Sequence, residues 1–560
     1  MSIKSRLHLK LRFILPTLVI VSMVLAACGG AATPSPTTQP PAQPTVAATE
    51  APTTEAPTTA PPATEAPTTA PAATEAPTTE APAAAAQGTL RIAMQPIVHT
   101  DPALISSDPE VLVANAVYDY LVDVTPKNTI EPRLATDWKV SDDGLTYTFT
   151  LASGVTFHDG SPFSAKDVVW TFKRLQDPNV ASATSDLYSN IADIQATGDL
   201  EVTFTLKQPN PFFLFDLSDN HALIMKADTT DPTDFNGTGP FIVKNYSPED
   251  RLVVDANPNY FIKGEPKLAE VQFIFFNDQT AQVDALKGGQ VDFVFAISTD
   301  LYNSLKDQPG ITQMQVATNQ FDLVRLRADQ KPGNDPRVMQ AFKLATDREA
   351  IFNLVLQNLG AIGSDTPIGP MYSQYYDAQY KPPARDVAKA KQLLSDAGYP
   401  NGLQIDLHTP DTGDRPNLAA VLKNQWAEAG IDINIIVEPE SVYYGDNGWL
   451  AVDLGITGWG SRPYPQFYLD VMVKCNAKWN EAHYCNPDLD KLITTAGTTL
   501  DEQERVSAYQ QIQKILVDQG PFIIPYFSAI KGAISDKFQG FEMKPFPGRS
   551  DLRNVSTSGS

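Results

Sequence analysis

Hydrophobic and polar residues alternate with two different periods in the second half of the chain. Residues 403–409, LQIDLHT, and residues 431–438, IDINIIVE, follow the two-residue period of half-buried strands. Residues 417–430 lie between them and carry a helical pattern that ends in a glycine, as helices commonly do. Because a strand, a helix and a strand in close succession form a right-handed parallel crossover, this pattern predicts an α/β fold.

Two other segments carry residues that start helices. Within residues 163–178, Ser164 is placed to cap a helix, and Asp167, three residues later, completes a capping box. Asn486 is a second cap, and Pro487 follows it at the first helical position, where a missing N–H has no cost. We therefore expect a helix to begin at each place.

The first 27 residues have the three-part layout of a secretory signal peptide, with cations, an apolar run over residues 13–27 and small residues at its end. This apolar run is too short to span a bilayer stably. Residues 25–28, LAAC, resemble the bacterial lipobox, at which Cys28 becomes the diacylated first residue of the mature protein. The alternative is an ordinary secreted protein with a chance cysteine.

Residues 28–87 contain almost only Ala, Pro, Thr and Glu, from which no hydrophobic core can form. Pro-rich chain favours extended polyproline II structure, so we interpret this segment as a disordered stalk. The chain beyond it exceeds the roughly 250–300 residues at which a single core stops growing. At least two lobes are therefore expected there.

The charge balance and the cysteines narrow the functional class. The formal net charge is −23, which disfavours nucleic acid and anionic membrane surfaces as partners. Once Cys28 is lipidated, only Cys475 and Cys485 remain, and in an oxidising compartment we expect them to form a disulfide. No cluster of His and Cys has the spacing of a metal site, and no catalytic fingerprint is present. We therefore expect no metal, no cofactor and no enzymatic activity.

Several stretches carry a resemblance to a known family. They include VYDYLVDV, GVTFHDGSPFSAKDVVWTF, NGTGPFIVKNY, ALKGGQVDFV and DPRVMQAFKLATDREAI. In this order they resemble the family 5 bacterial extracellular solute-binding proteins, which include oligopeptide- and dipeptide-binding receptors of ABC importers. The resemblance implies a two-lobed periplasmic-binding-protein-like α/β fold with a β-rich subdomain inserted in lobe one. It places lobe one at residues 88–322 plus 522–560 and lobe two at residues 323–521.

A two-strand hinge is implied between the lobes. Residues 321–327, FDLVRLR, and residues 521–530, PFIIPYFSAI, are the apolar, strand-like runs that a buried crossing needs. Two strands allow a hinge closure that buries a ligand between the lobes.

The loop GWGSRPYPQFYLD, residues 458–470, is the main candidate for ligand binding. The resemblance implies that in the peptide-binding relatives such a loop begins with a Trp, which is Trp459 here. Three residues later those relatives carry an Asp that pairs with the α-amino group of the bound peptide. This chain has Arg462 there instead, and a guanidinium favours a carboxylate or phosphate. The alternative is a surface arginine that stacks on Tyr464.

Other candidates rest on weaker signals. Asp365 follows a helix in a rigid loop and either faces the cleft or caps a turn. Arg327 lies just past the predicted crossing, and either faces the ligand or solvent. Tyr443 and Tyr464 either stack on a flat ligand or fill gaps in the core.

We therefore expect an extracellular receptor that captures an oligopeptide or an amino-acid-like compound and delivers it to an ABC permease. It would act as a monomer on the outer face of the cytoplasmic membrane. Two alternatives stay open: a carbohydrate receptor that uses Trp459 as an aromatic platform, and a structural lipoprotein without a ligand-responsive hinge.

Replacing Cys28 with Ala tests the lipid anchor. If Cys28 carries acyl chains, the Cys28→Ala protein should appear in the culture medium or stay unprocessed, because two or more chains are needed for stable anchoring. Fractionation of cells and medium measures this, and undiminished membrane retention of the variant would contradict the prediction.

Overall fold

The computed structural model describes residues 86–182, 184–445, 448–546 and 548–559. They belong to a compact unit that spans Glu80–Ser560. The predicted signal peptide (residues 1–27), the lipidation site Cys28 and the stalk up to residue 85 lie outside the described residues.

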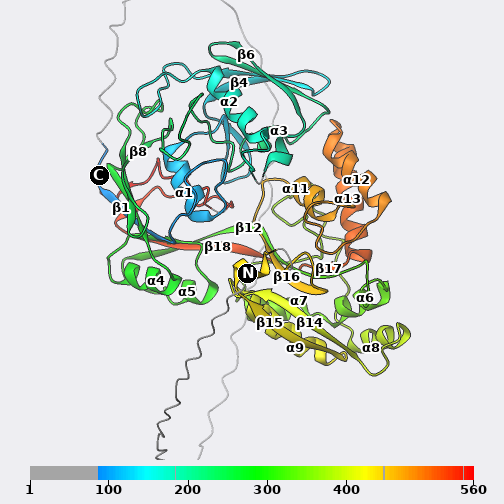
Figure 1. The fold of residues 1–560 in the computed structure, drawn as a ribbon. Helices are drawn as coiled ribbons and strands as arrows, with labels where there is room; N and C mark the ends of the chain where they lie inside the picture. Colours follow the sequence, from blue (N-terminus) through cyan, green and yellow to red (C-terminus); the bar gives the residue numbers. More distant parts are fainter. Residues whose placement is uncertain (1–85, 183, 446–447, 547, 560) are drawn as a thin grey trace, which may run out of the picture. The chain divides into compact units, whose positions relative to one another are not determined.

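A 12-stranded mixed sheet organises the described part of the chain, and two long strands lie in its middle. Strand β12 (Ile311–Leu326) pairs antiparallel with β18 (Tyr526–Ser535), as Figure 1 shows. On the β12 side the sheet continues through β16 (Leu454–Trp459), β14 (Leu403–Pro410) and β15 (Ile431–Glu438). On the β18 side it continues through β11 (Phe293–Phe295), β1 (Thr89–Met94), β10 (Glu270–Phe275), β9 (Arg251–Ala256) and β8 (Phe241–Ser247). Two short strands, β13 (Gly360–Ile362) and β17 (Phe522–Ile523), pair with β18 and β12 respectively.

Strands β12 and β18 form the predicted two-strand crossing. Side chains on β12 alternate between two hydrophobic cores: Phe321 and Leu323 belong to one, and Val324 and Leu326 to the other. A strand that is buried on both faces reads as an apolar run, which is why the sequence pattern identified it. The lobe boundaries predicted at residues 322 and 522 fall within β12 and at the first residue of β17.

The predicted crossover in lobe two is confirmed. Strands β14 and β15 are parallel, and helix α9 (Arg415–Ala427) connects them. Helix α12 (Pro487–Thr498) begins after Asn486, whose side chain accepts hydrogen bonds from the next backbone N–H groups. The remaining helices of this lobe are α6 (Pro336–Ala345), α7 (Arg348–Val355), α8 (Val387–Asp396), α10 (Glu440–Tyr443), α11 (Gln466–Tyr468), the π-helical turn η2 (Leu469–Val473) and α13 (Glu502–Gln519).

Lobe one contains the predicted β-rich insertion. Its antiparallel sheet has the order β4 (Ala135–Val140), β5 (Thr146–Leu151), β7 (Glu201–Leu206) and β6 (Ile191–Gly198). Helix α2 (Ala165–Gln176) packs against this sheet and begins with the predicted capping box, in which the Ser164 N–H donates to the Asp167 carboxylate over 2.7 Å. The other elements of lobe one are α1 (Asp108–Val117), β2 (Val122–Val124), β3 (Ile130–Pro132), η1 (Ser185–Tyr188), α3 (Phe213–Asp216), α4 (Gln279–Lys287), α5 (Thr299–Asn303), β19 (Phe538–Gln539) and β20 (Ser556–Thr557).

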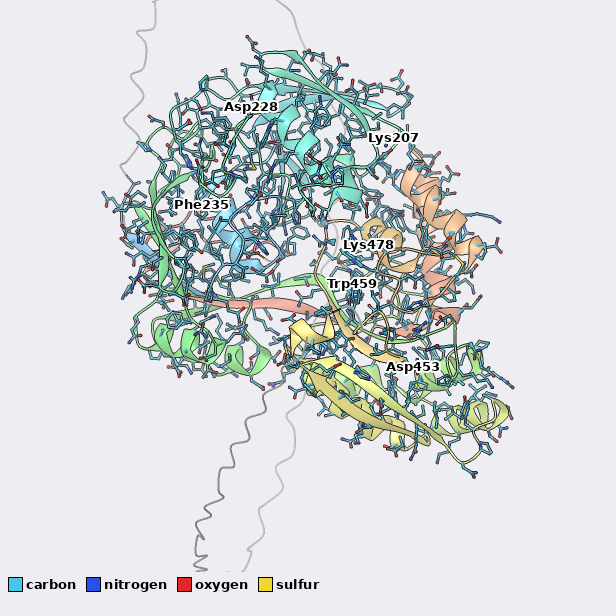
Figure 2. All side chains as sticks on the ribbon, in the orientation of Figure 1. Lys207, Asp228, Phe235, Asp453, Trp459 and Lys478 are labelled. Atoms are coloured by element: carbon cyan, nitrogen blue, oxygen red, sulfur yellow. A yellow bond between two sulfur atoms is a disulfide. The ribbon has the colours of Figure 1, made fainter. Side chains whose placement is uncertain are left out.

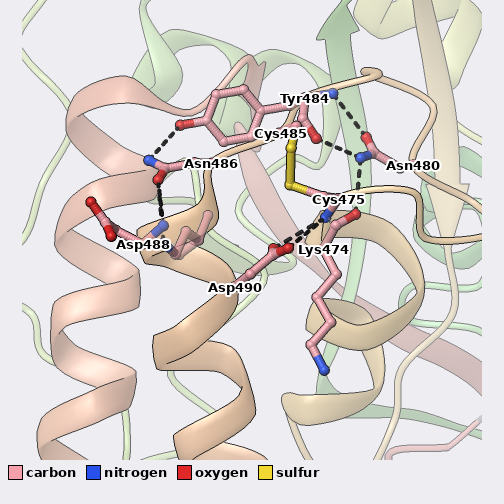
Figure 3. The surroundings of a disulfide bond; sticks show 9 residues. Lys474, Cys475, Asn480, Tyr484, Cys485, Asn486, Asp488 and Asp490 are labelled. Atoms are coloured by element: carbon pink, nitrogen blue, oxygen red, sulfur yellow. Dashed lines mark hydrogen bonds between the residues drawn. A yellow bond between two sulfur atoms is a disulfide. The ribbon is translucent and has the colours of Figure 1, made fainter.

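Cys475 and Cys485 form a disulfide, with their Cα atoms 4.5 Å apart. The disulfide closes a loop just before α12, and Figure 3 shows how side chains support it. The Cys475 N–H donates to Asp490 of α12, and the Asn480 amide bridges the carbonyls of Lys474 and Tyr484. The disulfide loop, residues 475–485, is thus held at its base and across its middle.

Two negative findings apply to the residues that the structure describes. No helix among them combines the length and apolarity needed to cross a membrane. No group of three or more metal-binding side chains gathers among them either.

Opening the disulfide should destabilise the protein. The double variant Cys475→Ser/Cys485→Ser loses the cross-link that restricts the unfolded chain, which stabilises by roughly 3 kcal/mol for a loop of this size. Thermal unfolding should therefore start at a lower temperature, and the wild-type protein in reductant should behave like the variant. Identical melting curves for variant and oxidised wild type would contradict this.

Candidate ligand-binding site

The loop after β16 belongs to lobe two and contacts lobe one directly. Strand β16 ends at Trp459, because Gly460, Pro463 and Pro465 interrupt its ladder. The loop then lies against lobe one, where the Asn128 amide donates to the Pro463 carbonyl over 2.7 Å. The candidate site therefore lies where the two lobes meet.

Arg462 reaches across to lobe one. Its guanidinium lies 3.6 Å from the carboxylate of Asp219 and 4.4 Å from the ring centre of Phe467. Its side chain keeps 28% of its surface exposed, so solvent still reaches the ion pair. The guanidinium of Arg462 therefore lies over the ring of Phe467 and not, as the alternative interpretation had it, over that of Tyr464.

A cavity of about 240 Å³ surrounds this ion pair, and we name it the arginine chamber. Its walls come from both lobes, with Asp108, Asp219 and Phe215 on one side and Arg462, Tyr464 and Phe467 on the other.

The two carboxylates of the arginine chamber have different environments. Burial raises the pKa of Asp108 to about 6, and the positive charge of Arg462 opposes that rise. Burial acts in the same direction on Asp219, but His221, 2.7 Å away, and Arg462 hold the pKa of Asp219 well below its usual range. Asp219 is therefore a fixed negative charge opposite a fixed positive one.

Tyr464 makes a second contact between the lobes. It is buried, its ring stacks on Phe212 with centres 4.8 Å apart, and its hydroxyl donates to the carboxyl group of Asp216. Asn210 also donates to Asp216, over 2.6 Å. Burial raises the pKa of Asp216 to about 8, so this contact holds a neutral carboxyl group at neutral pH.

Trp459 and Tyr443 do not reach the arginine chamber. Trp459 is buried, and its indole N–H donates to Glu481 over 3.1 Å. Tyr443 is also buried, with its hydroxyl 3.0 Å from that of Thr457. Both rings are buried and line neither wall of the arginine chamber, so their contact with a ligand stays a prediction.

Asp365 and Arg327 lie elsewhere as well. Asp365 is fully buried and pairs with Arg348 over 2.6 Å, so its charge is neutralised inside lobe two. Arg327 follows the far end of β12 and pairs with Asp329 over 2.6 Å. Since β12 and β16 are antiparallel, that end of β12 adjoins the start of β16, away from Trp459. Figure 2 shows the same separation, with Asp453 and Trp459 labelled at the two ends of β16.

Sequence reasoning missed the lobe-one half of the site. Asp216 and Asp219 both belong to the segment PFFLFDLSDN, where two acidic residues three positions apart follow a run of aromatic residues. Their place beside a run of aromatic residues was the available signal, although helix α3 ends at Asp216 and Asp219 lies beyond it.

Comparisons with known proteins agree with this architecture. A profile described as bacterial extracellular solute-binding proteins, family 5 Middle, matches residues 129–480. The probable di/tripeptide-binding protein 5 of Pseudomonas aeruginosa is 29% identical over 469 residues, which cover 77% of this chain and 88% of that protein. Heme-binding protein A of Haemophilus influenzae is 28% identical, over 79% of this chain and 87% of that protein.

Solved structures share the fold. The binding protein AgaA of A. tumefaciens R10, in complex with agropinic acid, has a TM-score of 0.73 and 24% identity over 84% of this chain and 99% of its own. The periplasmic binding protein DppA of Helicobacter pylori, in complex with the peptide STSA, has a TM-score of 0.74 and 24% identity over 84% of this chain and 98% of its own. At these identities they establish the fold alone, and they confirm the predicted two-lobed α/β architecture.

The Asp216→Asn variant tests the neutral carboxyl group under Tyr464. Asp216 keeps its proton in the folded protein up to about pH 8 but loses it near pH 4 when unfolded. The folded state thus binds more protons between these values, and stability should fall as the pH rises through this window. An amide does not titrate, so the melting temperature of Asp216→Asn should fall less than that of the wild type between about pH 5 and pH 8.

Asp142 is exposed and has no ion-pair or hydrogen-bond partner among the described side chains, so it provides the control. The Asp142→Asn variant should follow the pH profile of the wild type. If Asp216→Asn does the same, Asp216 is ionised in the folded protein and the assignment is wrong.

Proposed function

We propose that this chain, which belongs to the family 5 bacterial extracellular solute-binding proteins, is the receptor of an ABC importer and captures a peptide or amino-acid-like solute between its lobes. The arginine chamber carries the proposal, because its two walls come from lobes that are joined by two strands and can close on a ligand. Relatives named for di/tripeptide and dipeptide binding support the choice of solute. The protein acts as a receptor, not as an enzyme.

The ion pair in the arginine chamber indicates the charge of the solute. Arg462 and Asp219 present opposite charges at a solvent-accessible gap of 3.6 Å. A solute with an anionic and a cationic group can replace each partner, so that neither charge is left buried and unpaired. A carboxylate fits the planar guanidinium of Arg462, and an ammonium group fits Asp219.

The alternatives fit the site less well. A carbohydrate receptor that used Trp459, Tyr443 or Tyr464 as its platform would need that ring exposed, but all three are buried in contacts with the protein. A purely structural lipoprotein would have no use for opposed charges in a cavity between two lobes.

The setting of the receptor completes the proposal. Lipidated Cys28 anchors the chain to the outer face of the cytoplasmic membrane, and the Pro-rich stalk lets the lobes reach permease subunits as a monomer. Both segments lie outside the described residues, so sequence patterns alone support this part.

Native mass spectrometry of the purified protein tests the function directly. A co-purified peptide or amino-acid conjugate, or saturable binding of short peptides in calorimetry, is the expected result. A bound neutral sugar, with no response to peptides, would contradict the proposal.

Arg462→Ala should weaken binding of that solute by about ten- to hundredfold. A charge-assisted hydrogen bond contributes about 1.5–3 kcal/mol, and each ~1.4 kcal/mol is tenfold in affinity. The fold should persist, because Asp219 keeps His221 as a partner. Arg462→Lys should recover only part of the loss, since a point charge cannot replace the two-pronged guanidinium.

Arg337 offers a matched control for calorimetry. It pairs with Asp335 over 2.5 Å at the start of α6 and lines neither wall of the arginine chamber. Arg337→Ala should bind like the wild type. Unaltered affinity in Arg462→Ala would mean that Arg462 serves only to join the lobes.

A further inference from the structure

A second cavity adjoins the arginine chamber. It has a volume of about 370 Å³, and we name it the subdomain chamber. One wall is the edge of the β-rich insertion, with Ser189, Asn190 and Asn210. The other wall is lobe two, with Phe467 and Trp479. The two chambers share Leu187, Tyr464 and Phe467 as lining residues, so they adjoin each other.

The arginine chamber by itself is smaller than most ligand pockets. Ligand pockets usually measure about 300–1,000 Å³. The arginine chamber, at about 240 Å³, falls below this range, whereas the subdomain chamber alone lies within it. A solute that fills only the arginine chamber would leave the larger cavity to water.

The lining of the subdomain chamber fits an apolar group. Phe467 and Trp479 lie with their ring centres 6.4 Å apart and form an aromatic corner in lobe two. Opposite them, the side-chain amides of Asn190 and Asn210 are already hydrogen-bonded, through both N–H and C=O, to neighbouring groups of lobe one. Asp216 is also in this wall, but it carries no net charge at neutral pH because burial raises its pKa to about 8. The middle of the chamber therefore accepts an uncharged group.

Charged groups lie among the other lining residues. Lys474 is neutralised by Asp470 over 2.7 Å. Among the described residues, the Lys478 ammonium has one recorded contact, the ring of Trp479 at 6.0 Å, and the Asp186 carboxylate has none. Figure 2 shows Lys478 between Trp459 and the β-rich insertion, which carries Lys207. Lys478 and Asp186 belong to opposite walls, and both remain available to a ligand or to each other.

We propose that the solute is elongated and occupies both chambers, with its charged head at Arg462 and Asp219 and an apolar or aromatic tail in the subdomain chamber. The inference rests on the proposed function and refines its substrate class. It selects peptides of at least three residues, or amino-acid conjugates of that length, over free amino acids. It also gives the β-rich insertion a direct role in choosing the tail.

The probes are the peptides Ala-Ala, Ala-Ala-Phe and Phe-Ala-Ala, which cover both directions of binding. The test variant is Ser189→Trp, because Ser189 is exposed, lines the subdomain chamber and has a helical backbone that accepts a large side chain. The control is Ala196→Trp, on an exposed position of β6 that lines neither chamber. Melting temperatures confirm that both variants fold.

Calorimetry should show that the wild type binds one of the two Phe-containing tripeptides at least about tenfold more tightly than Ala-Ala, because a buried aromatic side chain stabilises the complex. Ser189→Trp should remove this difference and leave the affinity for Ala-Ala unchanged. Ala196→Trp should keep the difference. These results would support the proposal.

Two other outcomes overturn different claims. If the wild type binds the peptides but prefers neither tripeptide, or if Ser189→Trp affects Ala-Ala and the tripeptides equally, the two-chamber inference is wrong and the peptide receptor stands. If the wild type binds none of the three probes, the proposed peptide function fails, and the two-chamber inference fails with it.

Discussion

The buried carboxylate of Glu481 supports the whole region around the cavity. It has no exposed surface and accepts hydrogen bonds from Arg325 over 3.1 Å, Thr457 over 2.6 Å and the Trp459 indole over 3.1 Å. A buried charge without such partners would cost several kcal/mol. The carboxylate therefore restricts β12, β16 and the disulfide loop to one arrangement, in which all four groups are satisfied.

Both chambers depend on that arrangement. Arg462 lies three residues after the end of β16, and Trp479 lies two residues before Glu481, so one buried contact positions both walls of lobe two. The disulfide between Cys475 and Cys485 closes the loop on either side of Glu481 and limits how far Trp479 can move. The aromatic corner is thus preorganised, which lowers the entropy that a ligand has to lose on binding.

The two contacts between the lobes differ in kind. Tyr464 and Asp216 form a buried bond to a neutral carboxyl group, packed against Phe212, and no ligand charge is needed to satisfy it. Arg462 and Asp219 form a looser ion pair at 3.6 Å in a cavity. The first contact suits a role in holding the lobes in register. The second suits exchange with a charged solute, because solvent-accessible ion pairs contribute little net stability.

The sequence by itself determined the elements, since their signals are local. The alternation in residues 403–409 and 431–438, and the caps at Ser164 and Asn486, act within a few residues and were read correctly. It also placed Arg462 between the lobes through the resemblance to a family. Only the tertiary structure decided which charges remain free. Asp365 is neutralised by Arg348. Arg327 pairs with Asp329 at the end of β12 that is remote from Trp459. Asp219, which pairs with Arg462, comes from a segment far away in the chain. Whether a polar side chain is paired within the protein or free to bind a ligand depends on the partners that folding brings to it. Those partners are distant in the sequence, so no local pattern identifies them.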